Sequence, residues 1–229
     1  MTRVWTVFAL CSLGLLTWSQ SACEKKAIPP RNASQGQQAQ VDPADYLTQG
    51  TRVFFDDFER EALGESWTTK HPGWRIESGV VRDDNAKNLG LWLNQPTPQK
   101  TRISFKIRSG SMPAGKTFPG DVKCEAFATK QEHQAGYVFI NGGWSNQLDV
   151  VARLDEHGAD RKEQPAARVK ADEWVQWDII RTGKDLYWFR AGTLLMHYRD
   201  ESPVRGDFFG FNNWESRIAF DDLAIYELP

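Results

Sequence analysis

The stretch TRISFKIRS (101–109) alternates strictly between apolar and polar side chains. In an extended chain, Ile103, Phe105 and Ile107 fall on one face. The opposite face carries Arg102, Ser104, Lys106 and Arg108. This pattern is typical of an antiparallel strand with one buried face, because a helix would repeat its apolar residues every three or four positions.

Runs of similar character recur along the rest of the chain. They are residues 51–58, 73–81, 88–93, 121–129, 135–141, 146–155, 173–181, 185–190, 193–199, 207–212 and 217–228. Clusters of Gly, Asn, Asp and Pro separate them at the spacing of turns, and no run shows the period of an amphipathic helix. We predict an all-β fold, a two-sheet antiparallel β-sandwich of the jelly-roll type. A barrel is the alternative, and the continuous apolar runs favour two packed sheets.

The N-terminus differs from the rest. Arg3 precedes an apolar run from Val4 to Trp18. This run is shorter than the roughly 20 residues that a membrane-spanning helix needs. We therefore interpret residues 1–22 as a secretory signal peptide.

The end of this segment, Ser21-Ala22-Cys23, resembles the lipobox of bacterial lipoproteins, with Gln20 where those proteins usually carry leucine. The resemblance implies that Cys23 is acylated and that the membrane is reached through this lipid alone. Glu24 implies sorting to the outer membrane, so we expect the protein in the cell envelope, facing the periplasm or the cell surface.

Residues 23–50 are rich in Gln, Ala and Pro and predict a flexible tether after the lipidated Cys23. Residues 51–229 have the length of one domain with a substantial core. Of the 3 Cys, only Cys124 lies in this domain, so we expect it to be a buried strand residue. The net charge of −2 shows no excess of basic residues, which argues against nucleic acid as a partner.

The segment DEWVQWDIIRTGKDLYWFRAGTLLMHYRD (172–200) predicts a three-stranded meander with turns at 182–185 and 190–193. Its order of tryptophan strand, glycine turn, aromatic strand, glycine turn and strand resembles the concanavalin A-like lectin/glucanase domains, which are laminin G-like jelly rolls. VFFDDFEREALGESWTTKHPGWRIESGVV (53–81) is similar to the opening of such domains, and IAFDDLAIYEL (218–228) to their closing strand. The resemblance covers nearly all of residues 51–229.

Glucanases of this fold carry an E-x-D-x-x-E strand motif, which the chain lacks. Its nearest stretch is LDVVARLDE (148–156). We interpret Asp149 there as an inward polar residue, and Asp155 and Glu156 as turn residues. The 4 histidines show no metal-ligand spacing, and we interpret them as solvated or satisfied by hydrogen bonds.

Among the 10 Trp, two stand in asparagine-rich loops rather than in strands. Trp144 lies in INGGWSNQ and Trp214 in FNNWESR. An indole beside amide groups suits a sugar, because its apolar face takes the C–H face of the ring and the amides bond the hydroxyls. The candidate carbohydrate-binding residues are Trp144, Trp214, Asn141, Asn146, Asn212 and Asn213. Alternatively, the tryptophans cap the sandwich and the asparagines adopt positive φ in turns.

The other tryptophans of the domain divide into two groups. We expect Trp67, Trp74, Trp92 and Trp177 in the core, because they neighbour apolar strand positions. Two positions stay open for Trp174 and Trp188: the core, or a ligand-binding face of a sheet.

Asp57 and Asp222 form a candidate calcium site, because several branches of the resembled fold bind this ion near the paired terminal strands. A β-bulge between Phe220 and Leu223 would explain the acids without metal. No other cofactor is expected.

The leading functional hypothesis is carbohydrate binding, of a glycan or polysaccharide, by a lipid-anchored domain without a catalytic centre. Two alternatives are a glycoside hydrolase-like enzyme and a structural or protein-binding surface domain. A protein-binding domain would display an extended apolar patch.

Overall fold

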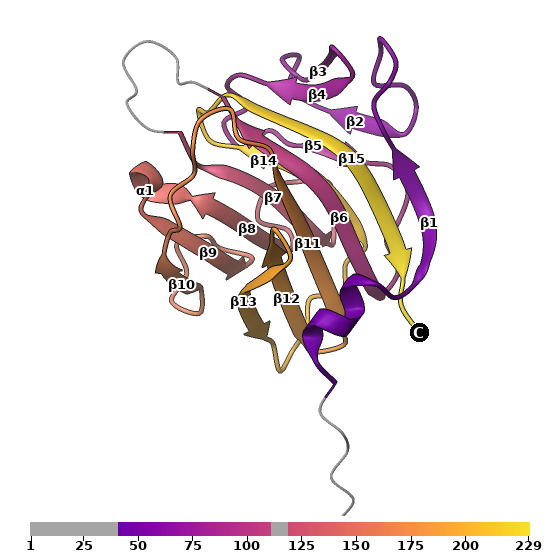
Figure 1. The fold of residues 1–229 in the computed structure, drawn as a ribbon, viewed down its shortest axis with the longest axis vertical. Helices are drawn as coiled ribbons and strands as arrows, with labels where there is room; N and C mark the ends of the chain where they lie inside the picture. Colours follow the sequence, from indigo (N-terminus) through magenta and orange to yellow (C-terminus); the bar gives the residue numbers. More distant parts are fainter. Residues whose placement is uncertain (1–40, 111–118) are drawn as a thin grey trace, which may run out of the picture. The chain divides into compact units, whose positions relative to one another are not determined.

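Strands dominate the computed structural model, which describes residues 41–110 and 119–229 (Figure 1). Residues Val41–Pro229 belong to one folded unit. One sheet has the strand order β13 (Thr193–Arg199), β12 (Asp185–Arg190), β11 (Val175–Thr182), β6 (Lys100–Ser109), β15 (Ile218–Glu227), β4 (Val80–Asp83) and β3 (Arg75–Glu77), with β1 (Thr51–Asp56) also paired to β15. The other has the order β10 (Lys162–Pro165), β9 (Leu148–Arg153), β8 (Tyr137–Gly142), β7 (Val122–Ala128), β14 (Phe208–Asn213), β5 (Leu91–Leu93) and β2 (Trp67–Thr69).

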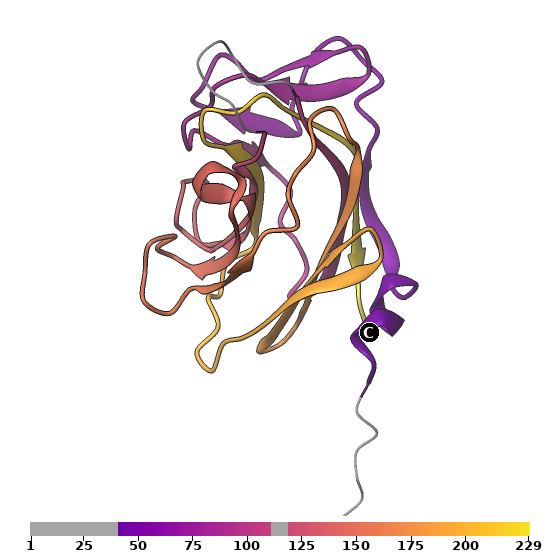
Figure 2. The ribbon, with the colours of Figure 1, turned by 60° about the vertical axis from the view of Figure 1, so that its left-hand side comes forward.

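The two sheets stack as separate layers, which Figure 2 shows for β8–β10 and the β12–β13 hairpin. Every strand pair is antiparallel. This architecture confirms the predicted two-sheet β-sandwich. The meander expected over 172–200 is also confirmed, as the consecutive neighbours β11, β12 and β13.

The core fills the space between the sheets with interlocked aromatic rings. Ile103, Phe105 and Ile107 of β6 are buried, as their alternation predicted. Phe105 packs on Trp177, which in turn contacts Trp188 with ring centroids 4.6 Å apart. Burying each such side chain stabilises the fold by about 1.5–3 kcal/mol.

The tryptophans predicted for the interior are buried, but one of them lies apart from the others. Trp67, Trp74 and Trp177 belong to the central core, as does Trp188. Trp92 is packed instead on the outer face of the seven-stranded sheet, in a small cluster with Ala128, Ala135 and Phe208. The exposed Trp174 lies under the Arg108 guanidinium on the eight-stranded sheet.

Cys124 is buried in β7, as predicted. Burial, together with the neighbouring Glu125 charge, raises the pKa of its thiol well above the usual value. The thiol is therefore held in its protonated, unreactive form.

The β-bulge anticipated near the C-terminus is confirmed, because the pairing of β15 with β6 shifts register between Asp221 and Ala224. Asp222 adopts a φ of 50° at this point.

The folded unit starts upstream of residue 51, the boundary expected from the sequence. A 3-10 helix, η1 (Pro43–Leu47), begins after Asp42, whose side chain accepts a hydrogen bond from the Ala44 amide. Tyr46 stacks on Tyr187 of β12. The proposed signal peptide, Cys23 and most of the tether lie outside the described residues, among which no helix is both long and apolar enough to cross a membrane.

Candidate functional site: a cavity on the seven-stranded sheet

Strand β7 places two charged side chains on the outer face of the seven-stranded sheet. Its residues alternate, so Cys124 faces the core while Lys123 and Glu125 face outward. In the neighbouring strand β14, Asn212 lies opposite Lys123 and Gly210 lies opposite Glu125. Both charged side chains are nonetheless buried, because loops fold over this face.

Loops that cover the sheet supply partners for both side chains. Lys123 Nζ lies 3.1 Å from Glu156 Oε2 in the β9–β10 loop and 3.0 Å from Asn88 Oδ1. Glu125 Oε1 lies 2.7 Å from His133 Nδ1 in the β7–β8 loop. His133 Nε2 lies 3.7 Å from Glu156 Oε1, which completes a chain of alternating charges. This polar chain, Lys123–Glu156–His133–Glu125, holds the β7–β8 and β9–β10 loops against the sheet.

The polar chain holds His133 and Glu156 as ions. Burial opposes the charge on His133, but hydrogen bonds to Glu125 and Glu156 outweigh it and raise its pKa to about 9. Burial likewise opposes the charge on Glu156. Its hydrogen bonds and charge interactions with His133 and Lys123 outweigh burial and lower its pKa to about 2. At neutral pH His133 is therefore a cation and Glu156 an anion.

A cavity of about 790 Å³ opens above this polar chain. Lys123, His133 and Glu156 line it from the sheet and the two loops. Its remaining walls include Asn88, Gly120, Trp144, Asn146, Trp214 and Ser216. The volume falls within the range of ligand pockets, about 300–1,000 Å³.

Trp144 enters this cavity from an unusual turn. Trp144, Ser145 and Asn146 have φ values of 50°, 63° and 64°, and Gly142 before them is also left-handed. Such backbone costs about 1–2 kcal/mol for each residue other than glycine. Asn146 holds the turn in place, because its amide bonds both the N–H and the C=O of Val169. The turn thus presents Trp144 on a rigid support.

The two tryptophans differ in what they present to the cavity. Trp144 is half-buried, with the Arg161 guanidinium over its ring at 4.7 Å and His157 against its edge. Trp214 is 41% exposed. Its loop is tied down by the hydroxyl of Ser216, which donates to the Gly120 carbonyl. Trp214 is consequently the more open apolar surface of the pair.

Of the four predicted asparagines, only Asn146 is among the cavity-lining residues, and its positive φ also matches the alternative turn interpretation. Asn141 donates to buried Asp149, which confirms the inward position expected for Asp149. Asn212 donates to Glu125, and Asn213 bonds Ala86 and Ser216. These three amides are buried and bond neighbouring residues of the protein. Their direct contact with a sugar stays a prediction.

The contacts of the polar chain are not predicted from the sequence. The sequence predicts Glu156 only as a turn residue; it does lie in a turn, but its side chain is buried against Lys123. His133 is satisfied by Glu125, as the interpretation of the histidines allowed. The available signal was the pair Lys123 and Glu125, which share one face of an otherwise apolar strand.

The structure gives each carboxylate of the candidate calcium site a partner of its own. Exposed Asp57 accepts a hydrogen bond from the Glu59 amide, and Asp222 forms an ion pair with Lys106. Within the described ranges, no group of three or more His, Cys, Asp or Glu side chains is arranged to hold a metal ion. Calcium binding at Asp57 and Asp222 stays a prediction.

No family model matches this chain, and no curated protein matches it. Solved structures do match. One comes from work on endo-acting O-glycanases that human gut microbiota express to initiate mucin breakdown (14% identity, 78% of this chain and 100% of that one, TM-score 0.58). A carbohydrate-binding module of family 66 from Bacillus subtilis is similar at 15% identity over 71% of this chain and 96% of that one, with a TM-score of 0.55. A laminarinase from Flavobacterium sp. UMI-01 is similar at 10% identity over 77% and 100%, with a TM-score of 0.57.

The domain has the concanavalin A-like jelly-roll fold. This confirms the fold that the resemblance of residues 51–229 implied. Because every identity is low, the likeness establishes the fold alone.

Proposed function

We propose that this domain binds a carbohydrate chain in the cavity above the polar chain and does not cleave it. One observation carries the proposal. Trp144 and Trp214, which are distant in the sequence, line the same cavity, and its other walls include hydrogen-bonding side chains such as Asn88, Asn146 and Ser216. Sugars need this combination of apolar surface and polar groups.

The surroundings of Glu156 and Glu125 support a binding role over a catalytic one. A glycoside hydrolase needs one carboxyl group with a raised pKa to protonate the leaving oxygen. Interactions with His133 and Lys123 lower the pKa of Glu156 to about 2 despite its burial. Glu125 is fully buried and accepts hydrogen bonds from Asn212 and the Gln134 amide, in addition to its contact with His133.

A glycoside hydrolase is the second candidate. It is favoured by one observation: Glu125 and Glu156 both approach His133 beside the cavity. Release of reducing ends from a bound glycan, lost in Glu156→Gln, would replace the binding proposal with this one.

A glycan array probed with the protein tests the binding proposal. We expect a hit whose affinity falls about tenfold or more in Trp214→Ala, since a central aromatic contact is worth at least about 1.4 kcal/mol. Trp174→Ala is the matched control, because Trp174 is 36% exposed but lies beside the other sheet. Equal losses in the two variants, or no bound glycan, would contradict the proposal. Repeating the array with a chelator tests the calcium prediction.

We further propose that the protein is held at the outer membrane by a lipid on Cys23 and presents this cavity in the cell envelope. The lipobox-like sequence Ser21-Ala22-Cys23 supports this placement.

A further inference from the structure

The segment that carries Asn88 is bonded to the segment that carries Trp214. The Asn88 amide donates to the Asn213 carbonyl over 2.9 Å, and Lys87 Nζ lies 2.9 Å from Glu215 Oε1. These two contacts involve the residues immediately before and after Trp214. Asn88 and Trp214 therefore line the cavity as neighbours, on two segments that the protein itself holds together.

The side chain of Asn88 is oriented by the polar chain. Its Oδ1 lies 3.0 Å from Lys123 Nζ. Because an ammonium group can only donate, the amide oxygen faces Lys123 and the amide nitrogen is left over. This Nδ2 makes no hydrogen bond to the described residues and is not among their buried, unpaired polar atoms. Asn88 therefore presents a free N–H donor.

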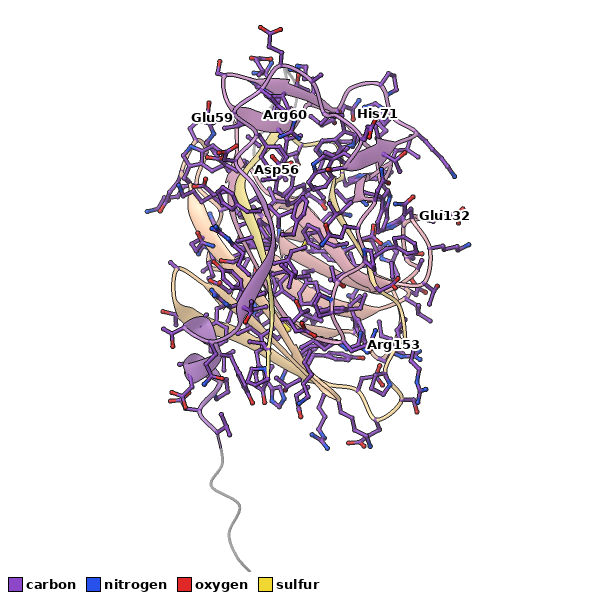
Figure 3. All side chains as sticks on the ribbon, turned by 90° about the vertical axis from the view of Figure 1, so that its right-hand side faces the viewer. Asp56, Glu59, Arg60, His71, Glu132 and Arg153 are labelled. Atoms are coloured by element: carbon purple, nitrogen blue, oxygen red, sulfur yellow. The ribbon has the colours of Figure 1, made fainter. Side chains whose placement is uncertain are left out.

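Gln134 supplies a second free amide. It lines the same cavity from the β7–β8 loop, which Figure 3 marks at Glu132. Its backbone N–H donates to Glu125 Oε2 over 2.8 Å, which fixes the residue beside the polar chain. Within the described ranges its side-chain amide makes no hydrogen bond, whereas the amide of Asn146 is engaged at both ends by Val169.

The open aromatic face of the cavity belongs to Trp214. The Arg161 guanidinium covers the ring of Trp144, which also packs on the outer apolar cluster with Ile140 and Val150. Trp214 is exposed, and no ring or guanidinium of the described residues stacks on it. A sugar ring that needs an apolar platform finds it at Trp214, next to the donor of Asn88.

The cations of the polar chain are already paired. The Lys123 side chain is 1% exposed, and its Nζ lies 3.1 Å from Glu156 Oε2. His133 has Glu125 at one ring nitrogen and Glu156 at the other, and the exposed His157 lies 3.7 Å from the same Glu156. An acidic sugar would lose hydration here without gaining an unpaired cation, whereas an uncharged sugar would only exchange hydrogen bonds.

We infer that the cavity takes an uncharged sugar, whose ring stacks on Trp214 and whose hydroxyl oxygens accept hydrogen bonds from the side-chain amides of Asn88 and Gln134. The inference rests on the proposed function and specifies its ligand and its polar contacts. It also gives the polar chain a role in recognition, because Lys123 keeps the Asn88 amide nitrogen free to donate.

Titration calorimetry with the full-length protein tests the charge of the ligand. The probes are oligosaccharides of β-glucan, galactan and mannan, and the same chains oxidised to carboxylates at their primary hydroxyls. We expect at least one neutral chain to bind. Its oxidised form should bind about tenfold or more weakly, because no free cation offsets the lost hydration of the carboxylates.

Asn88→Asp tests the first amide. Aspartate keeps an oxygen for Lys123 and tolerates the φ of 64° at this position, but its carboxylate cannot donate. We expect affinity for the neutral chain to fall about threefold to tenfold, without a fall in the urea midpoint. Asn85→Asp is the matched control and should keep the affinity, because Asn85 is exposed in the same loop and does not line the cavity.

Gln134→Glu tests the second amide. Glutamate has the same shape and replaces the donating nitrogen with an oxygen. We expect a loss of similar size for the neutral chain, again without a fall in the urea midpoint. Gln147→Glu, at an exposed position outside the lining residues, is the matched control and should bind as the unmodified protein does.

Three results would overturn the inference. They are an oxidised chain that binds as tightly as its neutral parent, unchanged affinity in Asn88→Asp or Gln134→Glu, and losses of equal size in these variants and their controls. Any of them would leave the proposed function standing, because a glycan would still be bound. Binding of none of these chains would also remove the inference, and an empty glycan array would then remove the proposed function as well.

Discussion

Lys123 is the residue on which the electrostatics of the site depend. Its side chain is 1% exposed and its ammonium reaches two carboxylates and one amide. The alternation of the strand residues already predicts from the sequence that this side chain lies outside the core. That it is buried depends on a loop about thirty residues further along the chain, which no local pattern reveals.

Removing the Lys123 charge should destabilise the fold strongly. Lys123→Met leaves Glu156 buried without its ammonium partner, and breaking a buried ion pair in this way costs about 3–5 kcal/mol. We expect this loss in the free energy of unfolding, measured with urea. Lys106→Met, which removes an exposed pair with Asp222, is the control and should cost less than about 1 kcal/mol. Similar losses in the two variants would show that the Lys123 pair is not buried in solution.

His133 should make stability fall at alkaline pH. Burial alone would lower its pKa, but the hydrogen bonds to Glu125 and Glu156 raise it to about 9 in the folded protein. A raised pKa stabilises the fold fully below the unfolded value of about 6.5, and this contribution is lost as pH rises through about 9. Urea midpoints between pH 6 and 10 should fall for the unmodified protein more than for His133→Gln. Parallel curves would contradict the assigned partners.

At the scale of elements, strands were predictable and loops were not. The alternation of β6 and the glycine turns of the β11–β13 meander are local signals, so their positions follow from the sequence. The turn Gly142–Asn146 was expected only as an asparagine-rich loop. Its left-handed backbone depends on the bonds between Asn146 and Val169, two segments joined only by tertiary structure.

A glycine in this turn should stabilise the protein. Ser145 has a φ of 63°, which costs a non-glycine residue about 1–2 kcal/mol. Ser145→Gly removes most of this cost, and we expect the free energy of unfolding to rise by up to about 1 kcal/mol. Ser104→Gly, in the middle of β6, should instead lower it, because glycine weakens a strand. A loss in both variants would contradict the left-handed turn.

At the scale of the whole molecule, the site is assembled from distant segments. Strand β14 pairs with β7 although some 80 residues separate them in the chain, and this pairing puts Trp214 beside the same cavity as Trp144. The sequence indicates each tryptophan separately as a candidate carbohydrate-binding residue. Their common cavity is a consequence of the order of the strands in the sheet.

The proposed anchor is tested on the full-length chain in a bacterial host. We expect an alkyne-bearing fatty acid to label the unmodified protein and the protein to fractionate with the outer membrane. Cys23→Ala should abolish both. Cys124→Ala is the matched control and should leave labelling unchanged, because its thiol is buried. Label that persists in Cys23→Ala would overturn the lipid assignment.

The fold class, the buried strand faces and the β-bulge near Asp222 follow from the sequence, because all of these depend on alternation and turn chemistry between near neighbours. Three features of the outer face of the seven-stranded sheet follow only from tertiary structure. They are the ion pair of Glu156 with Lys123, the contact of His133 with Glu125, and the position of Trp92 outside the central core. These contacts depend on which loops cover a sheet face, and that is set by the packing of segments far apart in the chain.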